Sequence, residues 1–193
     1  RVLKFTTVGN CVWNTPSNVS NIKALVVGGG GGGGGGAFAG GGGAGGFLYE
    51  PSHAVIPSHS YFIGVGSGGS AGSANFGSAS GYIDNSGGNG GNSLFDTMTA
   101  IGGGGGGGYV AGDTTMHTID ANTDSVTVRS ATTLNNISTD SSKGKNGGSG
   151  GGSSENTFHR SSATSGQGNA GGTPRLKTNA ITNPFTSVAA GGG

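Results

Sequence analysis

The sequence predicts an all-β, irregular protein in which a bundle of glycine segments takes the place of a side-chain core. Three observations predict this fold class. Nine consecutive glycines at 28–36 follow the apolar residues 25–27, and seven more at 102–108 follow residues 99–101. Only 31% of the 193 residues are hydrophobic while 48 are glycine, so an ordinary core of this size is out of reach. The i, i+3, i+4 apolar spacing of a helix is missing throughout.

A flexible linker is the alternative that such a composition suggests, because ordering a glycine backbone costs roughly 1–2 kcal/mol per residue. Apolar and aromatic residues bracket both runs, however: Val27 and Phe38 flank the first, and Ile101 and Tyr109 flank the second. Strand-like patterns also lie between the runs, which a solvated linker does not need. We therefore expect the glycine segments to be ordered.

The chain is expected to form one glycine-rich domain over residues 1–193, with three parts. Residues 1–27 form an N-terminal β unit. Residues 28–108 form the glycine core, which includes a β hairpin at 47–65. Residues 109–193 supply long loops and further glycine segments.

Within the N-terminal unit, the residues alternate between strand formers and turn formers. The pattern predicts, in order, a strand at 2–8, a turn at Gly9-Asn10, a resumed strand at 11–13, a loop at 16–21 and a strand at 22–27. Trp13 is the expected anchor of a small apolar core.

In the second β unit, residues 47–49 and 61–65 are rich in aromatic and β-branched side chains. Pro51 and Pro57 are expected in the connection between them. The longest glycine-poor insertion, 109–143, contains one alternating strand candidate at 125–129.

Ordered polyglycine has a simple physical form, the left-handed polyproline II conformation with three residues per turn. Its N–H and C=O groups point outward, so neighbouring helices can pair them, and only glycine permits the close approach. The sequence therefore predicts a bundle of polyglycine II helices with loops displayed at its ends. The residues expected in this structural glycine core are Gly28, Gly32, Gly36, Gly102, Gly105 and Gly108.

Several motifs occur in a fixed serial order over residues 1–108. They are Trp13-x-x-Pro16, 24–27 into polyglycine, Ala44-Gly45-Gly46-Phe47, 61–69, 90–95 and 99–102. This series resembles the glycine-rich domain of tailed-bacteriophage tail-fibre and adhesin proteins. The tip adhesins of T-even-like phages are similar in design, with sandwiched polyglycine II helices and variable receptor-contacting loops. The β-rich N-terminal unit looks more like the broader tail-fibre domain than like those adhesins.

The resemblance implies a non-enzymatic, extracellular component of the virion surface or tail fibre. Its implied partners are a bacterial surface receptor, either a glycan or an outer-membrane protein, and other virion or fibre subunits, with the chain itself forming a homo-oligomer. The alternative is a self-associating structural fibre or virion-surface subunit without a receptor role. An ice-binding glycine-helix protein would show regular tripeptide spacing, and the irregular loops argue against that class.

Receptor contact is expected from loops on a rigid scaffold. Aromatic faces stack on sugar rings, and Arg and His side chains donate hydrogen bonds to hydroxyls and carboxylates. The candidate receptor-binding residues are Tyr109, His117, Arg129, Phe158, His159 and Arg160. Tyr109 and Phe158 have an alternative role, which is to cap the ends of the glycine helices.

Other chemistry is not expected. The net charge of +1 gives no basis for nucleic-acid binding, and no apolar run approaches the ~18 residues that a membrane span needs. The G-x-G-x-x-G match at 64–69 is a chance product of the glycine content, and no phosphate-binding P-loop motif occurs. Among the four histidines, His53 and His59 are the only closely spaced pair, and no nearby Cys or acidic residue completes a metal-ligand set, so they are interpreted as surface or loop-packing residues and we expect no metal and no cofactor. No nucleophile elbow or Ser-His-carboxylate order stands out, so we expect no catalysis.

Overall fold

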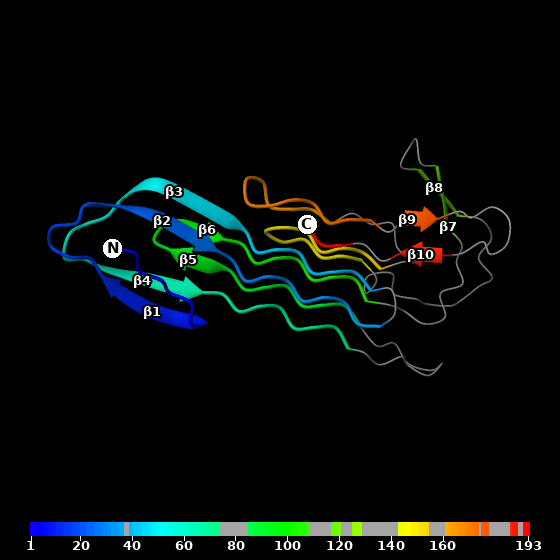
Figure 1. The fold of residues 1–193 in the computed structure, drawn as a ribbon, viewed down its shortest axis with the longest axis horizontal. Helices are drawn as coiled ribbons and strands as arrows, with labels where there is room; N and C mark the ends of the chain where they lie inside the picture. The colour runs from blue at the N-terminus through cyan, green and yellow to red at the C-terminus, as the bar shows by residue number, and fades with distance from the viewer. Residues whose placement is uncertain are drawn as a thin grey trace.

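The computed structural model describes residues 1–36, 39–73, 85–108, 117–120, 125–128, 143–154, 161–173, 175–177, 186–188 and 191–193. Over these residues the secondary structure consists of β-strands, with no helix. The predicted all-β class is therefore confirmed for this part of the chain. Figure 1 shows an elongated arrangement, in which β1–β6 lie at one end and the glycine segments run away from them along the long axis.

Six strands form the β unit, which comprises two antiparallel sheets. The first sheet has the order β1-β4-β5-β6, and the second pairs β2 with β3. The strand bounds are β1 Gly9–Asn14, β2 Asn21–Val27, β3 Phe47–Ala54, β4 Ser60–Val65, β5 Ser93–Phe95 and β6 Met98–Ala100.

A small apolar core lies between these two sheets. Its buried members are Ala24, Val26, Val55, Tyr61, Ile63, Phe95 and Ala100. Trp13 is partly buried and packs on this cluster, with its ring centroid 6.1 Å from those of Tyr61 and Phe95. The expected anchor thus lies at the edge of the core, and Tyr61 and Phe95 fill its centre.

Three expectations about strand positions were wrong. Residues 2–8 belong to no strand, and β1 begins only at Gly9, where the sequence suggested a turn. Gly9 has φ of 120°, a value that favours glycine and lets the chain change direction into β1. Pro51 lies inside β3 rather than in a connection, since β3 has one partner strand and carries a bulge at that point.

The expected hairpin at 47–65 does not form. β3 pairs with β2, whereas β4 pairs with β1 and β5. Hydrophobic patterning identified the strands, but pairing depends on contacts distant in sequence. The two strands joined by the 55–59 connection therefore belong to different sheets.

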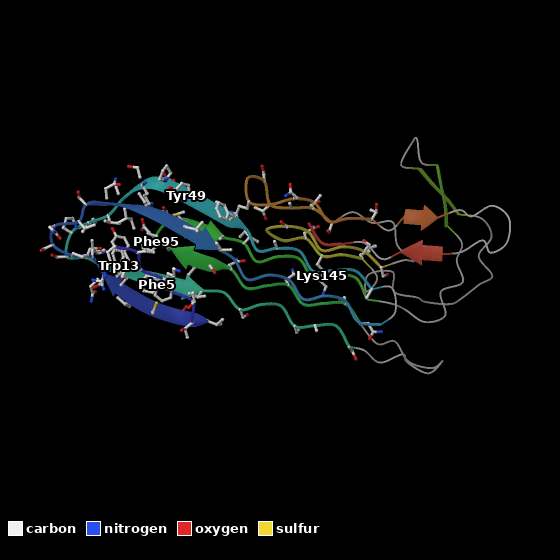
Figure 2. All side chains as sticks on the ribbon, viewed as in Figure 1. Phe5, Trp13, Tyr49, Phe95 and Lys145 are labelled. Carbon is white, nitrogen blue, oxygen red and sulfur yellow. The ribbon has the colours of Figure 1, made fainter. Side chains whose placement is uncertain are left out.

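The glycine-rich stretches continue these strands. We name them in chain order: segment I (28–36), segment II (39–46), segment III (66–73), segment IV (85–92), segment V (101–108), segment VI (143–147) and segment VII (148–154). Segment I follows β2, segment II precedes β3, segment III follows β4, segment IV precedes β5 and segment V follows β6. In Figure 2, side chains crowd the β unit and are sparse along these segments.

Pairing continues from the sheets into the glycine segments without a shift in register. Val27 pairs with Phe47 in the sheet, and the next residue, Gly28, donates its N–H to the carbonyl of Gly46. Ser93 pairs with Ala100, and Gly90 then donates to Gly103. The β unit therefore sets the alignment of the glycine segments that follow it.

The hydrogen bonds between segments recur at every third residue. From segment I, the N–H groups of residues 28, 31 and 34 donate to segment II, and those of 29, 32 and 35 donate to segment IV. The carbonyls of residues 30 and 33 accept from segment III. A spacing of three is that of a helix with three residues per turn, as in polyproline II. It supports the polyglycine II conformation, which itself stays a prediction.

Segment V forms the centre of this arrangement, and residues 102–108 are all buried. The N–H groups of residues 101–107 donate, in order, to Gln167 Oε1, Asn92 Oδ1, Gly29 O, Ser149 O, Asn89 Oδ1, Gly32 O and Gly152 O. Their carbonyls accept, in order, from the N–H groups of Gly46, Gly148, Gly90, Gly43, Lys145, Gly87 and Gly40. Because an unpaired buried group costs about 1–3 kcal/mol, this complete pairing explains how so much glycine can be ordered.

The predicted core glycines fall into two kinds. Gly28, Gly32, Gly102, Gly105 and Gly108 are buried, and a Cβ added to any of them would overlap a neighbouring backbone. Gly36 is different, because it lies at the end of segment I with φ of 93°. It is a turn glycine, required for its backbone conformation.

Candidate binding surface

Several glycine segments end at the same end of the arrangement, the one away from the β unit, and the chain continues from there into other intervals. Hydrogen bonds tie this end together laterally, from Gly35 to Asn85, from Gly40 to Gly107 and from Gly107 to Gly152. The intervals 74–84, 109–142 and 155–160 all depart from residues near this layer. The scaffold therefore fixes the starting points of these three intervals close together.

The six predicted receptor-binding residues all belong to the intervals 109–142 and 155–160. Tyr109, Arg129, Phe158, His159 and Arg160 lie outside the described residues. His117 is the first residue of β7, and only its backbone is described. Whether the six side chains gather on one surface stays a prediction.

Two short antiparallel hairpins lie in the C-terminal half of the chain, and Figure 1 shows both at the end opposite β1–β6. β7 (His117–Asp120) pairs with β8 (Ser125–Val128), and β9 (Arg175–Lys177) pairs with β10 (Thr186–Val188). The strand candidate at 125–129 is thus confirmed over 125–128. The sequence reasoning missed β7, β9 and β10, each of only three or four residues.

A cluster of rings joins the two sheets of the β unit. The His53 and Phe95 rings lie 5.3 Å apart between centroids, and Phe95 lies 5.5 Å from Tyr61. His53 Nε2 lies 3.0 Å from Asp96 Oδ2 and connects β3 to the turn between β5 and β6. Tyr61 accepts a 2.9 Å hydrogen bond from the N–H of Ile56. These contacts hold the two sheets together.

Asp96 is a residue that sequence reasoning missed. It lies 43 positions from His53 and occupies a tight turn with φ of 51°, a conformation that Asp tolerates better than most residues. His59, which is close to His53 in sequence, instead packs edge-on against the Tyr61 ring. The two histidines therefore have different partners, in keeping with their interpretation as packing residues.

Lys145 lies among the described glycine segments, as Figure 2 shows. Its Nζ donates a 2.8 Å hydrogen bond to the carbonyl of Gly87, and its backbone N–H donates to Gly105. Lys145 thus connects segments IV, V and VI. Its ammonium group is engaged in the scaffold and does not form a basic recognition surface.

Large apolar side chains are exposed over the β unit. On the outer face of the second sheet, Leu25 pairs with Tyr49 and Val27 pairs with Phe47, and the four are 49–57% exposed. On the first sheet, Val12 pairs with Phe62, at 61% and 52%. These cross-strand pairs leave apolar surface on both sheets, which is typical of an interaction surface.

A search of the described residues for clustered metal ligands finds no group of three or more His, Cys, Asp or Glu. The same part of the chain contains no helix long and apolar enough to cross a bilayer. Cys11 is a free, exposed thiol on β1.

A family model described as a glycine-rich domain matches residues 6–193, nearly the whole chain. The chain belongs to this glycine-rich domain family. Its match extends well beyond residues 1–108, where the serial motifs lie, so the later glycine stretches belong to the same domain family. A comparison of the glycine-rich domain with curated proteins found no match.

Proposed function

We propose that this glycine-rich domain is an attachment component of a bacteriophage virion that binds a bacterial surface receptor without catalysis. The observation that carries the proposal is that several intervals of the chain start from the same end of the glycine segments, the end away from the β unit. Gly107 and Gly152 are joined by a backbone hydrogen bond, and the intervals 109–142 and 155–160 begin shortly after them. A scaffold that starts two such intervals close together is suited to recognition.

Chain rigidity supports the same proposal. Segment V has its N–H and C=O groups paired over residues 101–107, so the base of the 109–142 interval has little freedom. Loops that start from a rigid base lose less conformational entropy on binding than loops on a mobile one. The proposed contact residues are Tyr109, His117, Arg129, Phe158, His159 and Arg160.

The test is binding of the fluorescently labelled chain to a panel of bacterial strains, to purified lipopolysaccharide and to isolated outer-membrane proteins. We expect saturable binding to particular strains, weakened at least tenfold by the combined substitutions Phe158→Ala, His159→Ala and Arg160→Ala. Phe62→Ala is the matched control, because this exposed aromatic residue lies on β4 of the β unit. Failure to bind any strain, or equal binding by the triple variant, would contradict the assignment of these loops.

A structural subunit of a fibre or virion surface is the second candidate. The exposed apolar pairs on the β unit favour it, because such surface is normally covered by a partner. Immunogold labelling of phage particles distinguishes the two roles. Label confined to the fibre tip supports attachment, and label repeated along a shaft supports the structural role.

A further inference from the structure

Segment I lies at an open edge of the glycine arrangement. Its neighbours are segments II, III, IV and V, each joined to it by backbone hydrogen bonds. Segments II and V are bonded to each other, as are V and IV, and IV and III. These four neighbours therefore form a continuous arc around segment I, and the side between segments III and II carries no described neighbour.

Unpaired donors face that open side. Among the described residues, the N–H groups of Gly30 and Gly33 donate to no acceptor. Each belongs to a peptide whose carbonyl, on Gly29 or Gly32, accepts from segment V. Because a trans peptide points its C=O and N–H in opposite directions, these two donors point away from segment V and out of the molecule.

Unpaired acceptors accompany them on the same segment. The carbonyls of Gly31 and Gly34 accept no hydrogen bond from the described residues. The N–H groups of the same peptides, on Gly32 and Gly35, donate to segment IV. These carbonyls therefore point away from segment IV, in a direction different from that of the free donors.

Space is also available at this edge. A Cβ built on Gly30 or Gly33 would lie 3.9 Å from the nearest atom, whereas one built on Gly31, Gly32, Gly34 or Gly35 would overlap backbone. Packing within one molecule thus requires glycine at two of every three positions of segment I. The remaining positions, Gly30 and Gly33, are nevertheless also glycine. Without a side chain there, another backbone can approach this edge closely.

An apolar face lies next to this edge along the chain. Leu25 and Val27 of β2 directly precede segment I, and their partners Tyr49 and Phe47 follow segment II. The same hairpin therefore offers exposed apolar side chains in its sheet portion and unpaired backbone groups in its glycine portion. The exposed apolar side chains and the unpaired backbone groups are independent features, and each is typical of a surface that a partner covers.

We propose that this edge, formed by segment I with the outer face of β2 and β3, binds a second copy of the chain. A glycine backbone can approach Gly30 and Gly33 as closely as the other glycine segments approach segment I, and its carbonyls, spaced three apart, match the spacing of the two free donors. The chain itself supplies such a backbone. The free donors and acceptors point in different directions, so the contact is heterologous and extends to assemblies beyond a dimer. The inference does not depend on the proposed receptor role.

The experiment is sedimentation velocity of the full chain across a concentration series. We expect concentration-dependent association of the unaltered chain, and a dissociation constant raised at least tenfold by Gly30→Ala with Gly33→Ala. Within the molecule, the added methyl groups make only an ordinary contact, at 3.9 Å from a carbonyl oxygen, but they hold the second backbone away. Gly191→Ala is the matched control, since an added Cβ at this glycine has no atom within 4 Å and the residue lies outside segment I.

A second variant and a second measurement keep the test decisive if the double alanine variant folds poorly. Leu25→Lys changes an exposed side chain and should weaken association in the same way. Hydrogen–deuterium exchange of the unaltered chain should show protection of peptides covering 28–36 rising with concentration. A monomer at the highest soluble concentration, association unaffected by these variants, or exchange independent of concentration would each overturn the proposal.

Discussion

The requirement for glycine varies from residue to residue within the glycine runs. In segment V, an added Cβ at any of residues 102–106 would overlap backbone, because neighbours surround the segment. In segment I the overlap spares Gly30 and Gly33, and in segment III it spares Gly68. A uniform run in the sequence thus contains positions of quite different sensitivity to substitution.

The first prediction compares two neighbouring glycines of segment I. Gly32→Ala places a methyl group against the carbonyl of Ser70, so one segment must shift. Overpacking of this kind costs about 1–3 kcal/mol, which lowers Tm by several degrees in a domain of this size. Thermal unfolding followed by circular dichroism measures the effect.

Gly30→Ala provides the control for that comparison, because its Cβ lies 3.9 Å from the nearest atom. At a concentration where the chain is monomeric, we expect its Tm to stay close to that of the unaltered chain or to rise slightly, since alanine restricts the unfolded chain more than glycine does. Equal losses of stability in the two variants would show that close backbone packing does not distinguish these positions.

Polar side chains complete the pairing where no backbone does. Asn92 Oδ1 accepts from Gly102 and Asn89 Oδ1 accepts from Gly105, both at 2.9 Å. These asparagines lie three residues apart, so segment IV carries an acceptor at the same interval as the N–H groups it serves. The sequence shows this interval in Asn89-Gly90-Gly91-Asn92, but it does not show which segment lies opposite.

At the level of elements, the sequence pattern predicted where a strand forms better than it predicted which strand is its partner. The strand at 22–27 and the glycine segments that follow β2 and β6 could be anticipated from the apolar residues that lead into them. The partner of β3 could not, because β2 and β4 are equally suitable in pattern and only the folded chain decides between them. Strand formation at 2–8 was overestimated, since strand propensity alone does not supply a neighbour.

The candidate site was less predictable than the fold. Loops are identified in sequence by exclusion, and their contacts depend on where the scaffold starts them. The intervals 109–142 and 155–160 start close together because Gly107 and Gly152, which are distant in sequence, are joined by a backbone hydrogen bond. The connection between His53 and Asp96 is hidden for the same reason.

The second prediction concerns the dependence of the glycine segments on the β unit. Phe95→Ala removes a buried ring that contacts Trp13, His53 and Tyr61, at a cost of about 3–5 kcal/mol. Because β5 and β6 lead into segments IV and V in continuous register, the amides of 101–108 should exchange faster together with those of the strands. Hydrogen–deuterium exchange with mass spectrometry measures both regions at once.

Phe62→Ala is the control for this variant, since Phe62 is 52% exposed on β4. It should leave exchange in both regions unchanged. If Phe95→Ala accelerates exchange in the strands while 101–108 keeps its protection, then the glycine segments hold their alignment independently of the β unit.

At the scale of the whole molecule, the buried interior of the β unit differs in composition from that of the glycine segments. The β unit buries seven apolar side chains, whereas the glycine segments bury backbone that is hydrogen bonded from several sides. Unfolding the first part exposes apolar surface, and unfolding the second exposes mainly peptide groups. These surfaces change the heat capacity in opposite directions, at about +0.45 and −0.26 cal/K/mol per Å².

The third prediction follows from that difference. Globular proteins show a heat-capacity increase on unfolding of about 12–15 cal/mol/K per residue, and this chain should fall clearly below that range because much of its interior is backbone. Differential scanning calorimetry measures the quantity directly, with agreement between calorimetric and van't Hoff enthalpies as the check on two-state behaviour. A value inside the ordinary range would mean that apolar burial, rather than paired glycine backbone, makes up most of the surface removed from water on folding.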